Sequence, residues 1–176
     1  MSKNTRMYGI IGLILILVGM VLGFVVPGIG IIQLIGLILI LLAYFNSSKE
    51  LGEPLIKKYV LYALVIAIVG SIIASVTTGT TLIGGVKKIS LSKLSGGALV
   101  GFIIAWILTI IASSFWYKAN ILMSDKTAVN LFKTGGLLIF IGAIGSIIFR
   151  IGSILMLIGY ILLLIAFINV RPVETA

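Results

Sequence analysis

Four carboxylates are the residues of this chain best suited to proton transfer or metal binding: Glu50, Glu53, Asp125 and Glu174. The chain contains no Cys and no His, which excludes disulfides, thiol nucleophiles, imidazole bases and ordinary zinc sites. All four acids lie outside the long apolar runs, whereas proton-coupled membrane sites place a carboxylate inside the bilayer. We therefore expect no catalytic residue, no metal and no cofactor, and interpret Glu50 and Glu53 as solvated charges of one loop.

Two other polar residues interrupt apolar sequence. Gln33 lies early in the second apolar run, where its amide is expected to hydrogen-bond across helices; contact with a substrate is the alternative. Arg150 stands between Phe149 and Ile151. It marks a turn between apolar helices and reaches a lipid phosphate or, alternatively, binds an anion or lines a pore. Gln33 and Arg150 are therefore the candidate polar or lipid contacts.

Small residues recur at four-residue spacing in several apolar runs, which places them on one face of a helix. Such faces let two helix backbones approach closely, so that van der Waals contact replaces the hydrophobic drive that lipid removes. Helix packing is favoured over ligand binding for these stripes. The predicted packing residues are Gly19, Gly23, Ala67, Ser71, Gly97, Gly101, Ala105 and Gly142.

The elements that carry these residues must be embedded in lipid. Hydrophobic residues make up 61% of the 176 residues, charged residues only 10%, and the mean hydropathy is +1.34. A soluble domain is typically about half apolar and about a quarter charged. The net charge of +9 comes from Lys and Arg that stand singly or in pairs between apolar runs. This placement is typical of juxtamembrane segments and does not indicate a nucleic-acid interface.

Six apolar runs have lengths close to that of a membrane span. They lack the alternating polarity of a barrel, so each is predicted to be a helix. The chain is thus predicted to be one all-α domain, residues 1–176. It would form a polytopic transmembrane bundle of six spans, with a short interfacial helix, capped by Ser124, between spans four and five. The spans are predicted at Met7–Val26, Ile29–Phe45, Tyr59–Val76, Ala98–Tyr117, Gly135–Phe149 and Gly152–Ile168.

Aromatic residues and turn residues add local expectations. Residues 80–89, with a central Gly-Gly pair, resemble a β-hairpin. Trp106 lies in the middle of a span and is expected to face a neighbouring helix. The other Trp and several Tyr fall near span ends, where amphipathic rings prefer the headgroup zone. These predicted interfacial aromatics are Tyr8, Tyr44, Tyr59, Tyr62, Trp116 and Tyr117.

The distribution of basic residues predicts the orientation. Alternate segments place nine Lys and Arg on the side of both termini and four on the other side, namely Lys87, Lys88, Lys93 and Arg150. Because cytoplasmic loops carry the excess of positive charge, both termini are predicted to be cytoplasmic in the cell membrane.

Two hairpins of the chain have similar sequences. Residues 34–46 match residues 157–169 at 8 of 13 positions, with an offset of 123. The same offset pairs Gly12 with Gly135 and Gly19 with Gly142. Residues 7–46 and 130–169 are therefore interpreted as parallel repeated hairpins; convergence of two apolar hairpins is the alternative.

The chain resembles a family of archaeal and bacterial multi-pass membrane proteins classed only as a domain of unknown function. The resemblance lies in residues 8–13, the Pro-Gly-Ile-Gly turn at 27–30, residues 36–39 and residues 55–59. It continues in the Phe-Lys-Thr-Gly-Gly segment that begins at Phe132, then in residues 141–143 and 166–167. The resemblance implies a membrane location and brings no activity or functional residue.

Two functions from different classes remain open. Abundant packing stripes and scarce polar residues inside the spans favour a non-enzymatic accessory or scaffold subunit of a membrane complex. Its partners would be membrane lipids and other membrane protein subunits, or further copies of itself. The alternative is a small transporter or channel for a neutral or anionic solute, built around the two matched hairpins. A path lined by Gln33, Ser71, Thr109, Ser113 or Ser146 would favour transport, whereas hydroxyls bonded to the backbone would favour the scaffold.

Overall fold

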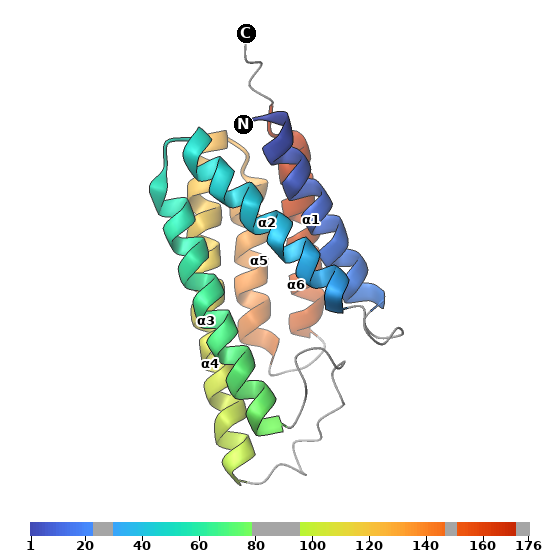
Figure 1. Ribbon diagram of the computed structural model, residues 1–176, viewed down its shortest axis with the longest axis vertical. Coiled ribbons are helices and arrows are strands. Elements are labelled where there is room, and N and C mark those ends of the chain that lie inside the picture. The colour runs from blue at the N-terminus through green and yellow to red at the C-terminus, as the bar shows by residue number, and fades with distance from the viewer. Residues whose placement is uncertain (23–29, 79–95, 147–150, 172–176) are drawn as a thin grey trace.

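The computed structural model describes residues 1–22, 30–78, 96–146 and 151–171, which form helices and no strand (Figure 1). Five helices are long and apolar enough to cross a membrane, whereas α5 has only 15 residues. The protein is therefore an all-helical membrane protein. The helices are α1 (Lys3–Leu22), α2 (Gly30–Glu50), α3 (Pro54–Thr78), α4 (Gly96–Thr127), α5 (Leu131–Gly145) and α6 (Ile151–Asn169).

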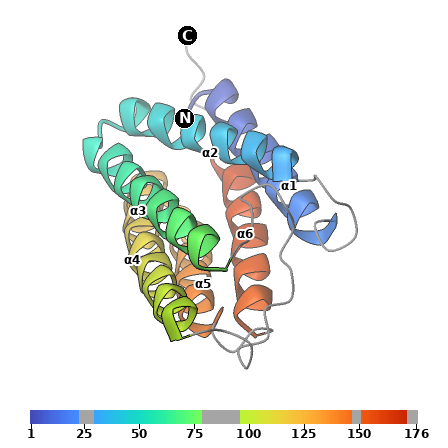
Figure 2. The ribbon, with the colours of Figure 1, turned by 60° about the horizontal axis from the view of Figure 1, so that its bottom comes forward.

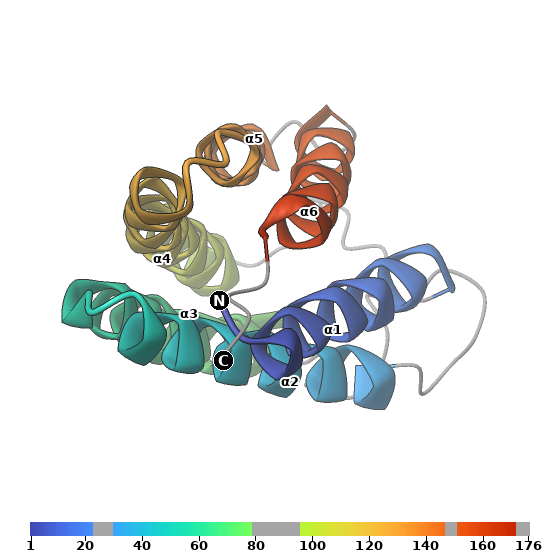
Figure 3. The same ribbon diagram turned by 90° about the horizontal axis from the view of Figure 1, so that it is seen from above.

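The helices form a closed ring. Each packs against its neighbours in the chain, and α1 also packs against α6, which closes the ring. Seen from above, α4, α5 and α6 form one row that faces α1, α2 and α3 (Figure 3). The starts of α1 and α5 and the ends of α2, α4 and α6 lie at one end of the bundle, here called the terminal end (Figure 1).

The polar segment expected between the second and third spans is mostly helical. α2 continues to Glu50 and α3 begins at Pro54, which leaves a short turn. Gly52 adopts the positive φ of 63° that this turn requires. Proline suits the first position of a helix, because its missing N–H has no partner there in any case. The turn therefore holds α2 and α3 close together at the terminal end.

The predicted interfacial helix between spans four and five is not a separate element. α4 is continuous over 32 residues, and Ser124 lies inside it, 3% exposed, instead of capping a new helix. The sequence from Lys118 to Thr127 contains no Gly or Pro to interrupt the helix. The break comes at Ala128, whose φ is 57°. The helix expected to lie along the membrane surface is thus the final part of a long helix.

Three predictions fall outside the described residues: the packing role of Gly23, the role of Arg150 and the hairpin at 80–89. The prediction for Trp106 is confirmed. Its indole N–H donates to the carbonyl of Ala143 at 3.2 Å, which joins α4 to α5.

The most buried aromatic side chains form a cluster. They come from α4, α5, α6 and α2, which runs from beside α1 to α3 (Figure 2). The ring centroids of Tyr44 and Trp116 are 4.8 Å apart, those of Tyr44 and Phe167 5.8 Å, and those of Phe132 and Phe167 5.0 Å. Tyr44, Phe132 and Phe167 are completely buried. The contacts of Phe167 with Tyr44 and with Phe132 are edge-to-face. Such contacts stabilise the fold by about 0.5–1.5 kcal/mol per pair beyond the burial of apolar area.

Candidate functional site

Glu50 joins the start of α1 to the end of α2. The backbone N–H of Ser2 donates to its Oε2 at 2.6 Å. The hydroxyls of Ser2 and Thr5 donate to its Oε1 at 2.7 and 2.6 Å. Hydrogen bonds to an ionised acceptor are stronger than neutral ones. Glu50 is exposed, as expected for a solvated charge, but it is the last residue of α2 and not part of a loop, and its carboxylate ties α1 to α2.

Further ties join other helices at the terminal end. The Arg6 guanidinium donates to the carbonyl oxygens of Phe167 and Ile168 at 3.2 and 2.9 Å, so α1 caps the last turn of α6. The Lys126 ammonium lies 3.3 Å from the Glu53 carboxylate, which links α4 to the turn between α2 and α3. Asp125 is exposed, and Glu174 lies outside the described residues. The contacts of Glu50 and Glu53 thus favour a structural role over a catalytic role for these carboxylates.

The seam between α1 and α6 is tight near the terminal end and open at the other. A Cβ built on Gly9 would lie 2.5 Å from the Phe167 ring, so glycine is required for this contact. Towards the opposite end the two helices enclose a cleft of about 380 Å³, here called the seam cleft. Its lining residues are Met20, Val21, Gln33, Ser153, Ile154 and Leu157.

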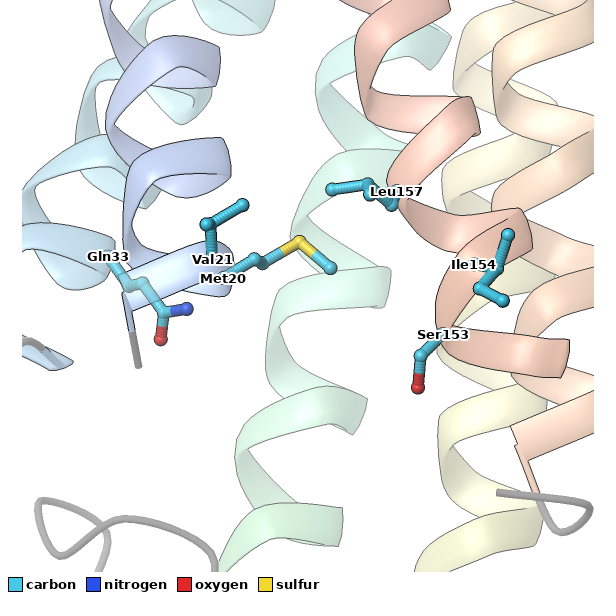
Figure 4. A pocket seen from close by; sticks show the side chains of 6 residues that line it. All are labelled: Met20, Val21, Gln33, Ser153, Ile154 and Leu157. Carbon is cyan, nitrogen blue, oxygen red and sulfur yellow. The ribbon is translucent and has the colours of Figure 1, made fainter. Parts of the chain in front are cut away.

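The seam cleft has apolar walls and two polar groups near one end (Figure 4). The side chains of Met20 and Leu157 extend from opposite walls, while the Gln33 amide and the Ser153 hydroxyl lie further from the terminal end. Gln33 is the fourth residue of α2 and Ser153 the third of α6, so both lie near helix ends. No hydrogen bond joins the Gln33 amide to another residue within the described ranges. A polar side chain in an apolar cleft is costly unless something hydrogen-bonds it.

Glycines bring the helices of each hairpin together. A Cβ on Gly12 would lie 2.8 Å from the Gly36 carbonyl oxygen, and a Cβ on Gly36 2.7 Å from that of Gly12. In α5 and α6, a Cβ on Gly135 would lie 2.9 Å from the Gly159 oxygen, and the reverse distance is 2.8 Å. Backbones that approach this closely exclude any side chain. The two contacts are equivalent at the sequence offset of 123.

The same offset relates a second contact of each hairpin. Gly19 of α1 contacts the Gln33 side chain of α2, and Gly142 of α5 contacts the Met156 side chain of α6. Gly19 and Gly142, both predicted packing residues, are buried. Gln33 and Met156 are therefore equivalent positions, because each side chain packs on a glycine of the preceding helix. Only Gln33 carries an amide.

The small-residue stripes of α3 and α4 have mixed surroundings. Gly101 and Ala105 are buried, Ser71 is half-buried, and Gly97 is exposed, with no described atom within 4 Å of a built Cβ. Close approach involves Gly70, which lay outside the predicted stripe: a Cβ there would be 3.3 Å from the Leu108 Cβ. Sequence spacing alone does not fix which face of α3 meets α4.

A central cavity of about 190 Å³ lies inside the ring. Side chains of α2 to α6 line it, including Ala67, Thr109, Ser113 and Tyr160. The hydroxyls of Thr109 and Ser113 donate to carbonyls of their own helix, Ala105 and Ile110, at 2.9 and 2.8 Å. The cavity is therefore mostly apolar.

The buried polar pair of Tyr44 and Asn120 was not predicted from the sequence. The Tyr44 hydroxyl donates to Oδ1 of Asn120 at 2.6 Å, and both side chains are 0% exposed. The Asn120 amide N–H donates to the Trp116 carbonyl at 2.9 Å. Tyr44 was predicted at the membrane surface, and the structure corrects this. Apolar Ile121 to Met123, which follow Asn120, were the signal that this segment is buried.

Comparisons with known proteins agree on the family. Residues 32–168 match the profile of a family described as protein of unknown function (DUF996). The chain is 32% identical to the uncharacterized protein MJ1644 of Methanocaldococcus jannaschii, over 81% of this chain and 78% of the relative. No solved structure matches the chain. The match covers most of α2 and all of α3 to α5, together with nearly all of α6. The protein therefore belongs to this family of proteins of unknown function.

Proposed function

We propose that the protein is a non-enzymatic accessory or scaffold subunit of a membrane complex. The observation that carries the proposal is the use of hydroxyl groups inside the bundle. Ser71, Thr109, Ser113 and Ser146 all donate to carbonyl oxygens of their own helices, at 2.7–2.9 Å. Hydroxyls bonded in this way are satisfied within their own helix and offer no line of donors to a passing solute.

The outer surface is apolar enough to pack against a partner. Large apolar side chains such as Ile38, Ile68 and Ile107 are exposed on α2, α3 and α4. Lipid alone can cover such faces, and so can the helices of another membrane protein. The test is purification of the tagged protein from its native membrane in a mild detergent, with mass spectrometric identification of companions. We expect a stoichiometric membrane protein that is absent when an unrelated small multi-pass protein carries the tag. Purification of the chain alone, under conditions that preserve known complexes, would contradict the proposal.

Transport of a small neutral or anionic solute is the second candidate, and the central cavity favours it. The cavity lies where five helices converge, which is where transporters place substrates. Reconstituted vesicles distinguish the candidates. Solute flux that stops when Ala67→Trp fills the cavity would favour transport, while equal permeability of protein-containing and empty vesicles would favour the accessory role.

The proposed topology has six spans and both termini in the cytoplasm. Single cysteines report it cleanly, because the chain has no native Cys. We expect Lys88→Cys to react with an impermeant maleimide in intact cells. Asp125→Cys, exposed at the terminal end, should react only after the membrane is opened. The reverse pattern would invert the topology, and labelling of both in intact cells would show an even number of crossings between them.

A further inference from the structure

We infer that the seam cleft binds one hydrocarbon chain of an anionic membrane lipid, with the Gln33 amide donating to the oxygen that links the chain to glycerol. This inference goes beyond the accessory role and does not rest on it. The binding residues are those that line the cleft in α1, α2 and α6. Its volume of about 380 Å³ falls within the range of about 300–1,000 Å³ typical of ligand pockets.

The repeated hairpins provide a reference for the role of Gln33. Met156, at the equivalent position, packs on Gly142 just as Gln33 packs on Gly19. An apolar side chain of similar length therefore suffices for that contact. The amide of Gln33 is not needed for packing, and no described side chain or carbonyl binds it. An external acceptor in the cleft explains why a polar group is stable there.

The position of the amide selects the part of the lipid that it meets. Gln33 and Ser153 lie near the helix ends, whereas Met20 and Leu157 extend the cleft towards the middle of the bundle (Figure 4). In a bilayer the glycerol linkage lies at the edge of the hydrocarbon region and the chain extends inward from it. Polar groups near the helix end and apolar walls further in match this order.

Charge complementarity selects an anionic headgroup. Glu50, Glu53 and Asp125 lie at the terminal end, away from the cleft. In the sequence, the segments that connect helices at the cleft end contain Lys87, Lys88, Lys93 and Arg150 and no acid. Each Lys or Arg near a membrane surface attracts anionic lipid by about 1 kcal/mol. α3 ends and α4 begins at the cleft end (Figure 1), so the positive charge of the sequence between them favours an anionic over a zwitterionic lipid.

The test is photolabelling of the full chain in phosphatidylcholine vesicles. The probe is a small fraction of phosphatidylglycerol that carries a diazirine in one acyl chain, and mass spectrometry locates the adducts. We expect adducts on Met20, Val21 and Leu157 to exceed those on Ile38 and Ile68, which are exposed on the outer surface. Unlabelled phosphatidylglycerol should compete for the cleft adducts and not for the others. The same diazirine chain on phosphatidylcholine should label the cleft several-fold less.

Two variants and two matched controls test the residues. Leu157→Trp fills the cleft and should abolish the cleft adducts, whereas Ile158→Trp, on the exposed face of α6, should not. Gln33→Met should fold and melt like the wild type, since Met156 makes the equivalent contact, yet lower the cleft labelling about three- to tenfold through loss of one hydrogen bond. Met156→Gln should leave the labelling unchanged.

Four results would overturn the inference. Adducts spread evenly over the cleft and the outer surface would show that the probe labels the protein only as bulk lipid. Wild-type labelling of Gln33→Met would remove the role of the amide, and equal labelling by the two headgroups would remove the anionic preference. A disulfide between two copies of Leu157→Cys would show that a second chain covers the cleft. Absence of a companion protein, by contrast, would affect only the accessory proposal.

Discussion

Gly12→Ala is expected to destabilise the protein, although alanine is the better helix former. The added Cβ would lie 2.8 Å from the Gly36 carbonyl oxygen and 2.9 Å from the Ile40 backbone nitrogen, so α1 and α2 would have to separate. Overpacking of this kind typically costs about 1–3 kcal/mol. The measurement is the midpoint of thermal unfolding in detergent. Gly135→Ala, the equivalent change in α5, should lower the midpoint to a similar extent, because the Gly159 oxygen is as close there.

Gly97→Ala is the matched control. It also places alanine in a helix, but a Cβ there has no described atom within 4 Å. It should raise stability slightly, since alanine is favoured over glycine in a helix by up to about 1 kcal/mol. If Gly12→Ala melts no lower than Gly97→Ala, the close approach of α1 and α2 is wrong. If only one of Gly12→Ala and Gly135→Ala is destabilising, the two hairpins do not pack equivalently.

The second large effect is expected at the buried pair of Tyr44 and Asn120. Tyr44→Phe keeps the ring and leaves Oδ1 of Asn120 without its donor in a fully buried site. A buried polar atom without a hydrogen-bond partner lowers the free energy of unfolding by about 1–3 kcal/mol. In membrane proteins the loss tends towards the low end of this range. We expect a loss of about 1–2 kcal/mol in the free energy of unfolding. Tyr62→Phe, at a residue that is 44% exposed, should change it little.

A double-mutant cycle isolates the pair. Asn120→Ala keeps the Cβ that packs on Gly136 and removes the amide. If the hydrogen bond is the coupling, Tyr44→Phe should cost much less in the Asn120→Ala background than alone. Additive losses would show that the two residues contribute independently, through packing with Trp116 and Phe167 and not through their bond.

Composition was sufficient to predict helices in a membrane, because lipid leaves no other way to satisfy the backbone in these apolar runs. Their ends were harder to predict. The polar residues Asn46 to Glu50 and Lys118 to Thr127 ended the predicted spans but not the helices. Polarity marks where a helix leaves the hydrocarbon, whereas a helix ends where the backbone turns, here at Gly52 and Ala128.

The candidate site was predictable only in part. Gln33 stood out as an amide in apolar sequence, and glycine spacing singled out Gly19, on which it packs. The seam cleft itself depends on how α1 leans away from α6. Helix tilt is set by packing against neighbours and by anchoring residues, so no local pattern encodes it. Asn120 was missed because the polar Lys118 beside it was interpreted as the end of a span.

The ring also has a consequence for biosynthesis. Every principal helix contact except that of α1 with α6 joins neighbours in the chain, so most of the structure can assemble in the order of synthesis. Local contacts of this kind require little loop-closure entropy. The seam instead joins α1 to α6, which is made after the other five described helices. Until α6 has entered the membrane, the nascent protein is an open arc in which Gly9 of α1 lacks its contact with Phe167. Arg6 then reaches the last carbonyls of α6 only when synthesis of that helix is complete.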